Sequence, residues 1–318
     1  MILLRNPFSF LTRENSTLSK GGGQMEFIVR ECPNNGIFGG SFEKTITAYI
    51  VPQHSSAEIS IEQLGERIIT IHTVEDVSIY DLHHLYFDLK RLLMLLDGQF
   101  YPPVSVTQDG VEITTSIEKK LLPNYQSADF MIGENNRLIS YEDVLSEAIF
   151  SDWCMIQKEL DIVHNVILYS LSNVEMPVDM KCAFLVEAFS GMGELIQNRR
   201  KDFILPKKKS KDESELGLRL EYIISHYGQA IFQDECQRNL GEFVQILTNS
   251  RNRIAHIKSK QNKRFLNGKE SVLYLCKLSL MYRIILFDLL NVPQSLYQER
   301  LSNRVETINH WWVDNCAK

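Results

Sequence analysis

The sequence predicts an α+β domain, with a mostly antiparallel sheet and a packed helix, followed by an all-α helical bundle. Apolar and polar residues alternate with a period of two through most of residues 26–75 and again at 103–115, which is typical of strands. After about residue 138 the period becomes helical and strand patterns stop. A length of 318 residues also exceeds the usual size of one core, which favours two domains.

The first domain is expected at residues 26–137, after an N-terminal arm at 1–25. Three glycines at 21–23 give a flexible break before the first regular pattern. Turn-forming residues then separate β-rich runs, as expected of an antiparallel sheet. These runs lie at 45–51, 57–61 and 67–72.

One helix and one hairpin are expected in the same domain. Apolar residues recur at helical spacing from Ile79 and stop at Gly98, which predicts a helix that ends at this glycine. Asp109-Gly110 separates β-rich runs at 103–107 and 111–115 and is a hairpin signal.

The second domain is expected at residues 138–318 and to contain only helices. Ser140 and Asp143 have the spacing of a capping box and predict a helix to about residue 150. Pro177 precedes another helix, and a polar loop is expected at 201–213. The remaining helices are expected at 152–171, 178–198, 215–227, 233–250, 270–290 and 294–312.

Composition limits the partners of this chain. Hydrophobic residues make up 44% and charged residues 23%, as in globular proteins with a sizeable core. The net charge of −6 means that any contact with nucleic acid needs a local basic patch. The six cysteines are scattered singly, which fits a reducing compartment. We expect a cytoplasmic protein with no membrane contact, because the apolar start at residues 1–4 is too short for a signal peptide.

No cofactor and no metal is expected. His83 and His84 are adjacent on the predicted helix, so they face different sides and are poorly placed to share a metal. The carboxylates show no spacing typical of a metal-dependent nuclease, and the chain has no glycine-rich phosphate loop of the nucleotide-hydrolysing kind.

The candidate catalytic residues are Arg251, Asn252 and His256, in the pattern Arg-Asn-x3-His. Histidine exchanges protons near neutral pH, as cleavage through a ribose 2′-hydroxyl requires. Arginine holds phosphate oxygens and keeps its charge throughout. Asn252 is suited to orient a neighbour by hydrogen bonding. Glu187 is either a fourth member that orients Arg251 or His256, or a surface carboxylate, and the sequence leaves both interpretations open.

Spacing alone is weak support for this motif, because Arg67 and His72 repeat it. That pair lies in a strand pattern, where the two side chains point to opposite faces. A second choice, Arg304 with His310, has a looser spacing. In a regular helix, five residues leave Arg251 and His256 about 140° apart. A site shared between two copies of the chain removes this difficulty, so we expect a homodimer.

A basic flank favours contact between this segment and RNA. Only Glu270 is acidic between residues 251 and 270. The expected RNA-binding residues are Arg253, Lys258, Lys260, Lys263 and Arg264. Four lysines at 207–211 form a second basic run, for which a solvated surface and RNA contact are equally favoured.

The second domain, over about residues 140–312, resembles the HEPN domain of ApeA-type abortive-infection proteins. Three features carry this resemblance. The first is Arg251-Asn252-x3-His256, followed by a basic stretch and a long apolar helix from Val272 to Leu290. The second is the segment 184–189, in which Glu187 precedes an aromatic residue, and the third is a linking helix around Trp153. The first domain resembles the ApeA N-terminal domain through its helix at 85–98, a likeness that rests on pattern more than on chemistry.

The resemblance implies a metal-independent endoribonuclease that acts as a dimer in anti-phage defence. It would damage RNA, for example tRNA, leave a 2′,3′-cyclic phosphate, and respond to a phage-derived trigger or a regulatory partner. The first domain would then sense the trigger, restrain the nuclease or select the RNA. Proteins of this type often carry a His-Arg pair where this chain has Ser190-Gly191-Met192, so help from that pair is absent.

Two other functions remain open at this stage. A HEPN-like module can bind RNA or a protein without cleaving anything, and a metal-dependent nuclease can use carboxylates that form no recognisable motif. Loss of cleavage in EDTA would favour the metal-dependent nuclease, and binding without cleavage would favour the module.

Overall fold

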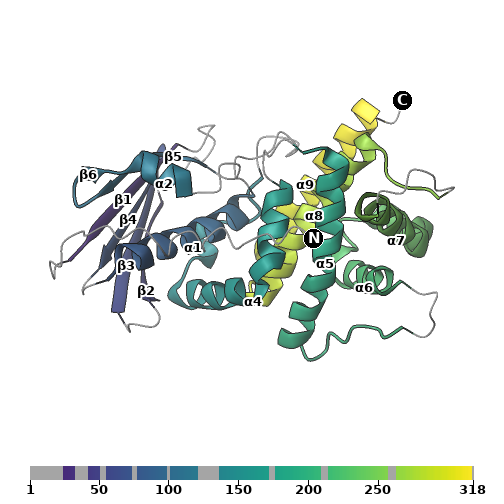
Figure 1. The fold of residues 1–318 in the computed structure, drawn as a ribbon, viewed down its shortest axis with the longest axis horizontal. Helices are drawn as coiled ribbons and strands as arrows, with labels where there is room; N and C mark the ends of the chain where they lie inside the picture. The colour runs from purple at the N-terminus through teal and green to yellow at the C-terminus, as the bar shows by residue number, and fades with distance from the viewer. Residues whose placement is uncertain are drawn as a thin grey trace. The chain divides into compact units, whose positions relative to one another are not determined.

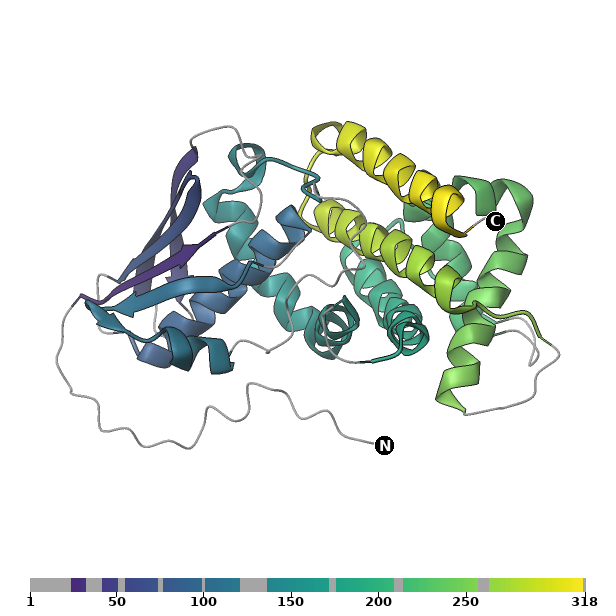
Figure 2. The same ribbon diagram turned by 90° about the horizontal axis from the view of Figure 1, so that it is seen from above.

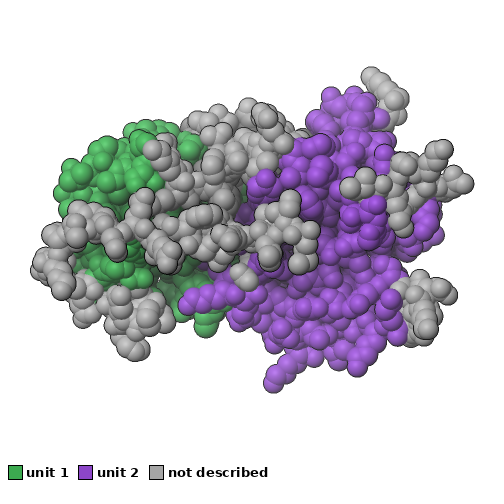
Figure 3. Space-filling view, in the orientation of Figure 1, with its two compact units in different colours: residues 1–126, 140–155 green, residues 127–139, 156–318 purple. Residues whose placement is uncertain are grey.

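The computed structural model describes residues 24–32, 42–50, 55–73, 77–98, 101–120, 136–171, 176–208, 214–256 and 263–316. The chain divides into two compact units (Figure 3), which we call the sheet unit and the helical unit. The sheet unit comprises residues 1–126 and 140–155, and the helical unit comprises 127–139 and 156–318. The predicted order, a sheet followed by helices, is confirmed.

The sheet unit contains a six-stranded antiparallel sheet with the strand order β2-β3-β4-β1-β5-β6 (Figure 1). Its strands are β1 (Glu26–Glu31), β2 (Phe42–Ile50), β3 (Ser55–Leu64), β4 (Glu66–Thr73), β5 (Pro103–Gln108) and β6 (Val111–Glu112). Every other residue of the central strands faces the core, so that Phe27, Ile59 and Ile69 are fully buried.

One long helix, α1 (Ile79–Asp97), packs on this sheet (Figure 2). The rings of Phe27 in β1 and Tyr86 in α1 lie 5.4 Å apart between centroids. The predicted end of the helix is confirmed, because Gly98 adopts a φ of 67° and its N–H bonds to Met94.

The predicted Asp-Gly hairpin joins β5 to β6, with positive φ at both Asp109 and Gly110. The predicted strand over 111–115 is wrong beyond residue 112. The Val106 N–H donates to the Thr114 hydroxyl at 2.7 Å. A longer β6 would need this N–H for its backbone hydrogen bonds with β5. A short helix, α2 (Thr114–Lys120), therefore replaces the rest of the strand.

Residues 140–155 belong with the sheet, whereas the sequence places the boundary at 137/138. The Tyr141 hydroxyl bonds to Asp97 at 2.6 Å, and the Trp153 ring N–H donates to the Asp88 carbonyl at 2.8 Å. Ser140 makes no capping hydrogen bond, so the predicted helix from this residue to 150 shrinks to α3 (Tyr141–Val144). Ser146 accepts from the Ile149 N–H at 3.3 Å and precedes α4 (Glu147–Leu171).

A cluster of buried charges lies between the sheet and α1. Arg67 donates to Glu31 at 2.8 Å and to Asp97 at 2.8 Å, and Lys90 also donates to Glu31. Burial raises the pKa of Glu31, but the charges of Arg67 and Lys90 outweigh this effect and hold the pKa below its ordinary value. Arg67 and Lys90 thus stabilise the charged form of Glu31 inside the core.

The helical unit is built around α5 and α8, and its described residues form helices and loops. Besides residues 156–171 of α4 it contains α5 (Val178–Arg199), α6 (Glu215–Ile223), a π-turn (Ile224–Gly228), α7 (Gln233–Ala255), α8 (Gly268–Leu289), a 3₁₀ turn (Gln294–Leu296) and α9 (Gln298–Cys316). Helix α5 packs against α6, α7 and α8, and α8 packs against α9 (Figures 1 and 2).

The helix ends on either side of the candidate motif differ from the prediction. Helix α7 continues to Ala255, five residues beyond its predicted end at 250, so it carries most of the candidate motif. Helix α8 begins with a true capping box, in which Asn267 and Glu270 bond to each other's backbone N–H.

Helices α4 and α5 approach closely at Gly191. A Cβ atom placed on Gly191 would lie 2.5 Å from Cγ2 of Val163, a distance that real side chains do not reach. Glu159 of α4 and Arg199 of α5 form an ion pair at 2.7 Å across the same two helices. The close approach of the two helices therefore requires glycine at position 191.

We expect Gly191→Ala to destabilise the helical unit by about 1 kcal/mol or more, because the β-branched Val163 cannot rotate away from the added methyl group. In a Val163→Ala background the same change should stabilise the unit, since alanine is the better helix former by about 1 kcal/mol. Urea unfolding of the four proteins measures this coupling. Equal effects in both backgrounds would contradict the close approach of the two helices.

Candidate functional site

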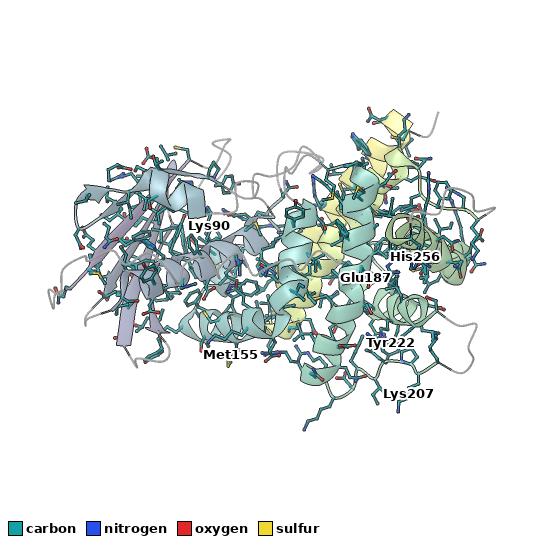
Figure 4. The ribbon with its side chains drawn as sticks, in the orientation of Figure 1. Lys90, Met155, Glu187, Lys207, Tyr222 and His256 are labelled. Carbon is teal, nitrogen blue, oxygen red and sulfur yellow. The ribbon has the colours of Figure 1, made fainter. Side chains whose placement is uncertain are left out.

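The last two turns of α7 position the candidate motif beside α5. Glu187 lies on α5, and Arg251 lies on α7 with its Nε 2.5 Å from the Glu187 Oε2 atom. Figure 4 shows Glu187 on α5 and His256 near the end of α7. The arginine side chain is 25% exposed and the glutamate 48% exposed, so this ion pair lies at the surface of the helical unit. Of the two interpretations of Glu187, the structure favours an orienting contact with Arg251.

Asn252 completes the surroundings of Arg251. Its Oδ1 atom accepts from the Nη1 atom of Arg251 at 2.9 Å. Glu187 and Asn252 together engage Nε and Nη1, and within the described ranges no residue accepts from Nη2. A guanidinium held in this way keeps three of its five N–H groups for an anion, such as a phosphate.

His256 caps the C-terminal end of α7. Its backbone leaves the helix, with φ −109° and ψ 3°, and its N–H still bonds to the Asn252 carbonyl at 3.1 Å. The side chain is exposed. Among the described residues it has no hydrogen bond, ion pair or ring contact. The structure thus brings Glu187, Arg251 and Asn252 together, whereas the His256 side chain forms no hydrogen bond or ion pair with these three residues.

The return segment 263–267 follows the flank of α7. The Asn249 side-chain amide donates to the Arg264 carbonyl at 3.1 Å, and Ser250 accepts from the Leu266 N–H at 2.8 Å. These two bonds carry the basic return segment alongside the last turns of α7.

The predicted RNA-binding residues differ in their surroundings. Lys263 is exposed, and the guanidinium carbon of Arg253 lies 3.9 Å from the centre of the Phe265 ring. Arg264 pairs with Glu270, whose hydrogen bond raises the pKa of Arg264, so this arginine already has an anionic partner. Lys258 and Lys260 lie outside the described residues.

Sequence reasoning missed two residues near the motif. Arg219 of α6 donates to the Ser190 hydroxyl at 3.1 Å and to Glu194 at 2.7 Å, which fixes α6 against α5 beside Glu187. Phe265 was missed although it directly follows two basic residues, and an aromatic side chain inside a basic run is a recognisable signal for nucleic-acid contact.

The two rival Arg–His pairs do not form sites. Arg67 is 1% exposed while the side chain of His72, on the other face of β4, is 48% exposed. Arg304 is buried on α9, and His310 is exposed with Glu306 3.9 Å away. The rejection of the first pair is confirmed, and the second pair is not brought together.

Comparison with family models, with curated proteins and with solved structures finds no match for this chain. Across the described ranges, no group of three or more His, Cys, Asp or Glu side chains is placed to hold a metal ion. Within the same ranges, no helix has the length and apolar character needed to span a membrane.

Proposed function

We propose that this chain is a metal-independent endoribonuclease of the HEPN type that acts as a homodimer. The observation that supports this most is the arginine of an Arg-Asn-x3-His motif held by Glu187 and Asn252 beside an exposed histidine. Arginine fixed in this way would bind the phosphate, and histidine would move the proton.

The proposed reaction uses the ribose of the RNA as the nucleophile. His256 takes the proton of a 2′-hydroxyl, and the 2′-oxygen forms a bond to the adjacent phosphorus. The bond from phosphorus to the 5′-oxygen breaks, and a protonated histidine supplies the proton of the new 5′-hydroxyl. Arg251 stabilises the charge on the non-bridging oxygens. The products are a 2′,3′-cyclic phosphate and a 5′-hydroxyl, so this step consumes no water.

A dimer is proposed because of the spacing of Arg251 and His256 at the end of α7. Helical backbone continues to Ala255, and Arg251 points to Glu187 of α5. Five helical residues turn the direction of a side chain by about 140°. His256 of one copy would therefore complete the site with Arg251 of the other copy. In anti-phage defence, the sheet unit would restrain this site or respond to a phage-derived trigger.

The purified chain, incubated with total RNA and with tRNA in EDTA, tests this function. We expect new fragments whose 3′ ends carry a cyclic phosphate, detected by sequencing of the cleavage ends. Cleavage that disappears in EDTA would instead indicate a metal-dependent nuclease.

A second candidate is an RNA-binding module without catalysis. One observation favours it, namely that the His256 side chain forms no hydrogen bond or ion pair with Arg251, Asn252 or Glu187. The same purified protein would then bind RNA and leave its length unchanged, with or without added metal ions.

Glu187→Gln should lower the turnover number about 100-fold with little change in KM, because Arg251 loses the charged partner that orients it. The melting temperature should hardly move, since a half-exposed ion pair contributes at most about 1 kcal/mol. Glu194→Gln is the matched control, because Glu194 pairs with Arg219 on the same face of α5 and is 61% exposed. Equal losses in the two variants would show that Glu187 has no special role.

A further inference from the structure

We propose that Arg253 and Phe265 form a stacking platform for one unpaired base, and that the substrate of the proposed ribonuclease is therefore single-stranded RNA. This inference rests on the proposed function, which it deepens by naming the form of RNA that is bound. It begins from a pair of side chains that the motif itself does not require.

The two side chains are already in contact. The guanidinium carbon of Arg253 lies over the Phe265 ring, 3.9 Å from its centre, a distance that fits stacking of the guanidinium on the ring. Phe265 is half-buried and Arg253 is exposed, so the second face of the guanidinium points to solvent. No acidic side chain in the described ranges pairs with Arg253. We infer that the platform is a flat, charged surface whose outer side has no ion-pair partner in the part of the chain that the structure describes.

The backbone beneath the platform is fixed on both sides of Phe265. The preceding carbonyl, at Arg264, accepts from Asn249, and the following N–H, at Leu266, donates to Ser250. The Leu266 side chain is 3% exposed and anchors this segment in the core. A platform that is rigid before binding loses little conformational freedom when a base stacks on it.

The platform lies next to the proposed general base. Arg253 precedes His256 by three residues, a spacing that makes side chains neighbours on a helix surface. Arg251 precedes Arg253 by two residues and so faces away from it, toward Glu187. The two arginines thus have different tasks, with Arg251 holding the phosphate and Arg253 stacking on a base beside His256.

The chemistry of the platform selects an unpaired base. Proteins stack bases on aromatic rings and on arginine planes only where the bases are splayed out of a helix. The bases of duplex RNA are stacked on each other and present no free face to this platform. Lysine carries the same charge as arginine but has no plane, so Arg253→Lys separates stacking from simple attraction to phosphate.

Binding can be measured apart from cleavage with a fluorescent RNA strand whose riboses all carry 2′-O-methyl groups. Without a 2′-hydroxyl this strand cannot be cut by the proposed reaction. We expect the full-length chain to bind the single strand more tightly than its duplex. Arg253→Ala, Arg253→Lys and Phe265→Leu should each weaken binding of the single strand about tenfold. Lys263→Ala, which removes an exposed charge of the same return segment, is the matched control and should weaken binding less.

A series of strands, each with one abasic position, gives the sharpest comparison. Removal of the base at one position should lower the affinity of the native chain about tenfold. The same removal should leave the affinity of Arg253→Ala unchanged, because that variant has already lost the contact between Arg253 and the base. Three results would each overturn the platform. They are native affinity in Arg253→Lys, equal affinity of the native chain for duplex and single strand, and a series in which no abasic position lowers the affinity.

Cleavage of unmodified RNA distinguishes the two proposals. Base-dependent binding without any cleavage would reject the ribonuclease and keep the platform. If the native chain cleaves RNA but binds every abasic strand with the same affinity, the ribonuclease is kept and the platform is rejected. Binding and cleavage that are both absent would reject both.

Discussion

His256→Ala is expected to lower RNA cleavage by about a thousand-fold or more, because it removes the group that moves the proton. The folded protein should be unaffected, since the side chain is exposed and has no hydrogen bond, ion pair or ring contact with the described residues. Binding of uncleavable RNA should also persist, because the arginines and lysines remain. Cleavage rate, melting temperature and RNA affinity measured on the same preparation separate these three effects.

His310→Ala is the control for this variant. His310 is an exposed histidine of the same unit, 72% exposed, and belongs to the rejected pair with Arg304. We expect native cleavage from it. If His256→Ala cuts RNA as fast as this control, the proposed site is wrong.

Mixing two inactive variants tests whether the site is shared between copies. Arg251→Ala and His256→Ala chains are each inactive alone. In a mixed dimer, one composite site receives its arginine and its histidine from the two unmodified positions. Unfolding and refolding the two variants together should therefore restore about a quarter of the native activity, since half of the dimers are mixed and each has one intact site. If the mixture stays inactive while the native chain refolded in the same way is active, each chain has its own complete site.

Turns and helix ends that depend on the conformation of one residue were predictable from the sequence. Gly98 ends α1 and Asp109-Gly110 closes the last hairpin, because positive φ values restrict which residues fit. The capping box shows the limit of this approach. Ser140 has the pattern without the side-chain hydrogen bond, while Asn267 has both. Residue types alone do not determine whether the chain places a donor within reach.

Contacts between residues distant in the chain were harder to predict. Residues 140–155 join the sheet unit through Tyr141 and Trp153, whose partners lie 44 and 65 residues earlier in the chain. No local pattern carries that information. Glu187 was singled out for its helix, but only the packing of α5 on α7 brings it to Arg251. The same holds for Phe265, whose contact with Arg253 depends on how the return segment follows α7.

Arg67→Met should unfold the sheet unit more readily than any surface change, with a loss of about 3–5 kcal/mol in the free energy of unfolding. Arg67 is 1% exposed and bonds to Glu31 and Asp97, which are themselves buried. Methionine fills much of the same volume but carries no charge. Glu31 and Asp97 then lose the cation that both of them contact, and keeping their charges buried without that cation is costly.

Arg30→Met provides the control, because Arg30 and Glu66 form an ion pair at 3.4 Å with both side chains about half exposed. Its loss should change the free energy of unfolding by no more than about 0.5 kcal/mol. Urea unfolding followed by Trp153 fluorescence reports on the sheet unit, in a background where Trp311 and Trp312 are replaced by phenylalanine. Equal losses in the two variants would contradict the buried cluster.

The pH dependence of the Arg67→Met loss identifies its cause. In the native chain the pKa of Glu31 lies below 4.5, its unfolded value, so its stabilising contribution is present above pH 4.5 and is lost as the pH falls further. Without Arg67 the pKa of Glu31 rises, and the folded variant then binds a proton that the unfolded chain has released. The stability of the variant should therefore fall as the pH rises from 4 to 7, and its difference from the native chain should widen over the same interval. A loss that is equal at both pH values would reflect a packing defect and not the missing charge of Arg67.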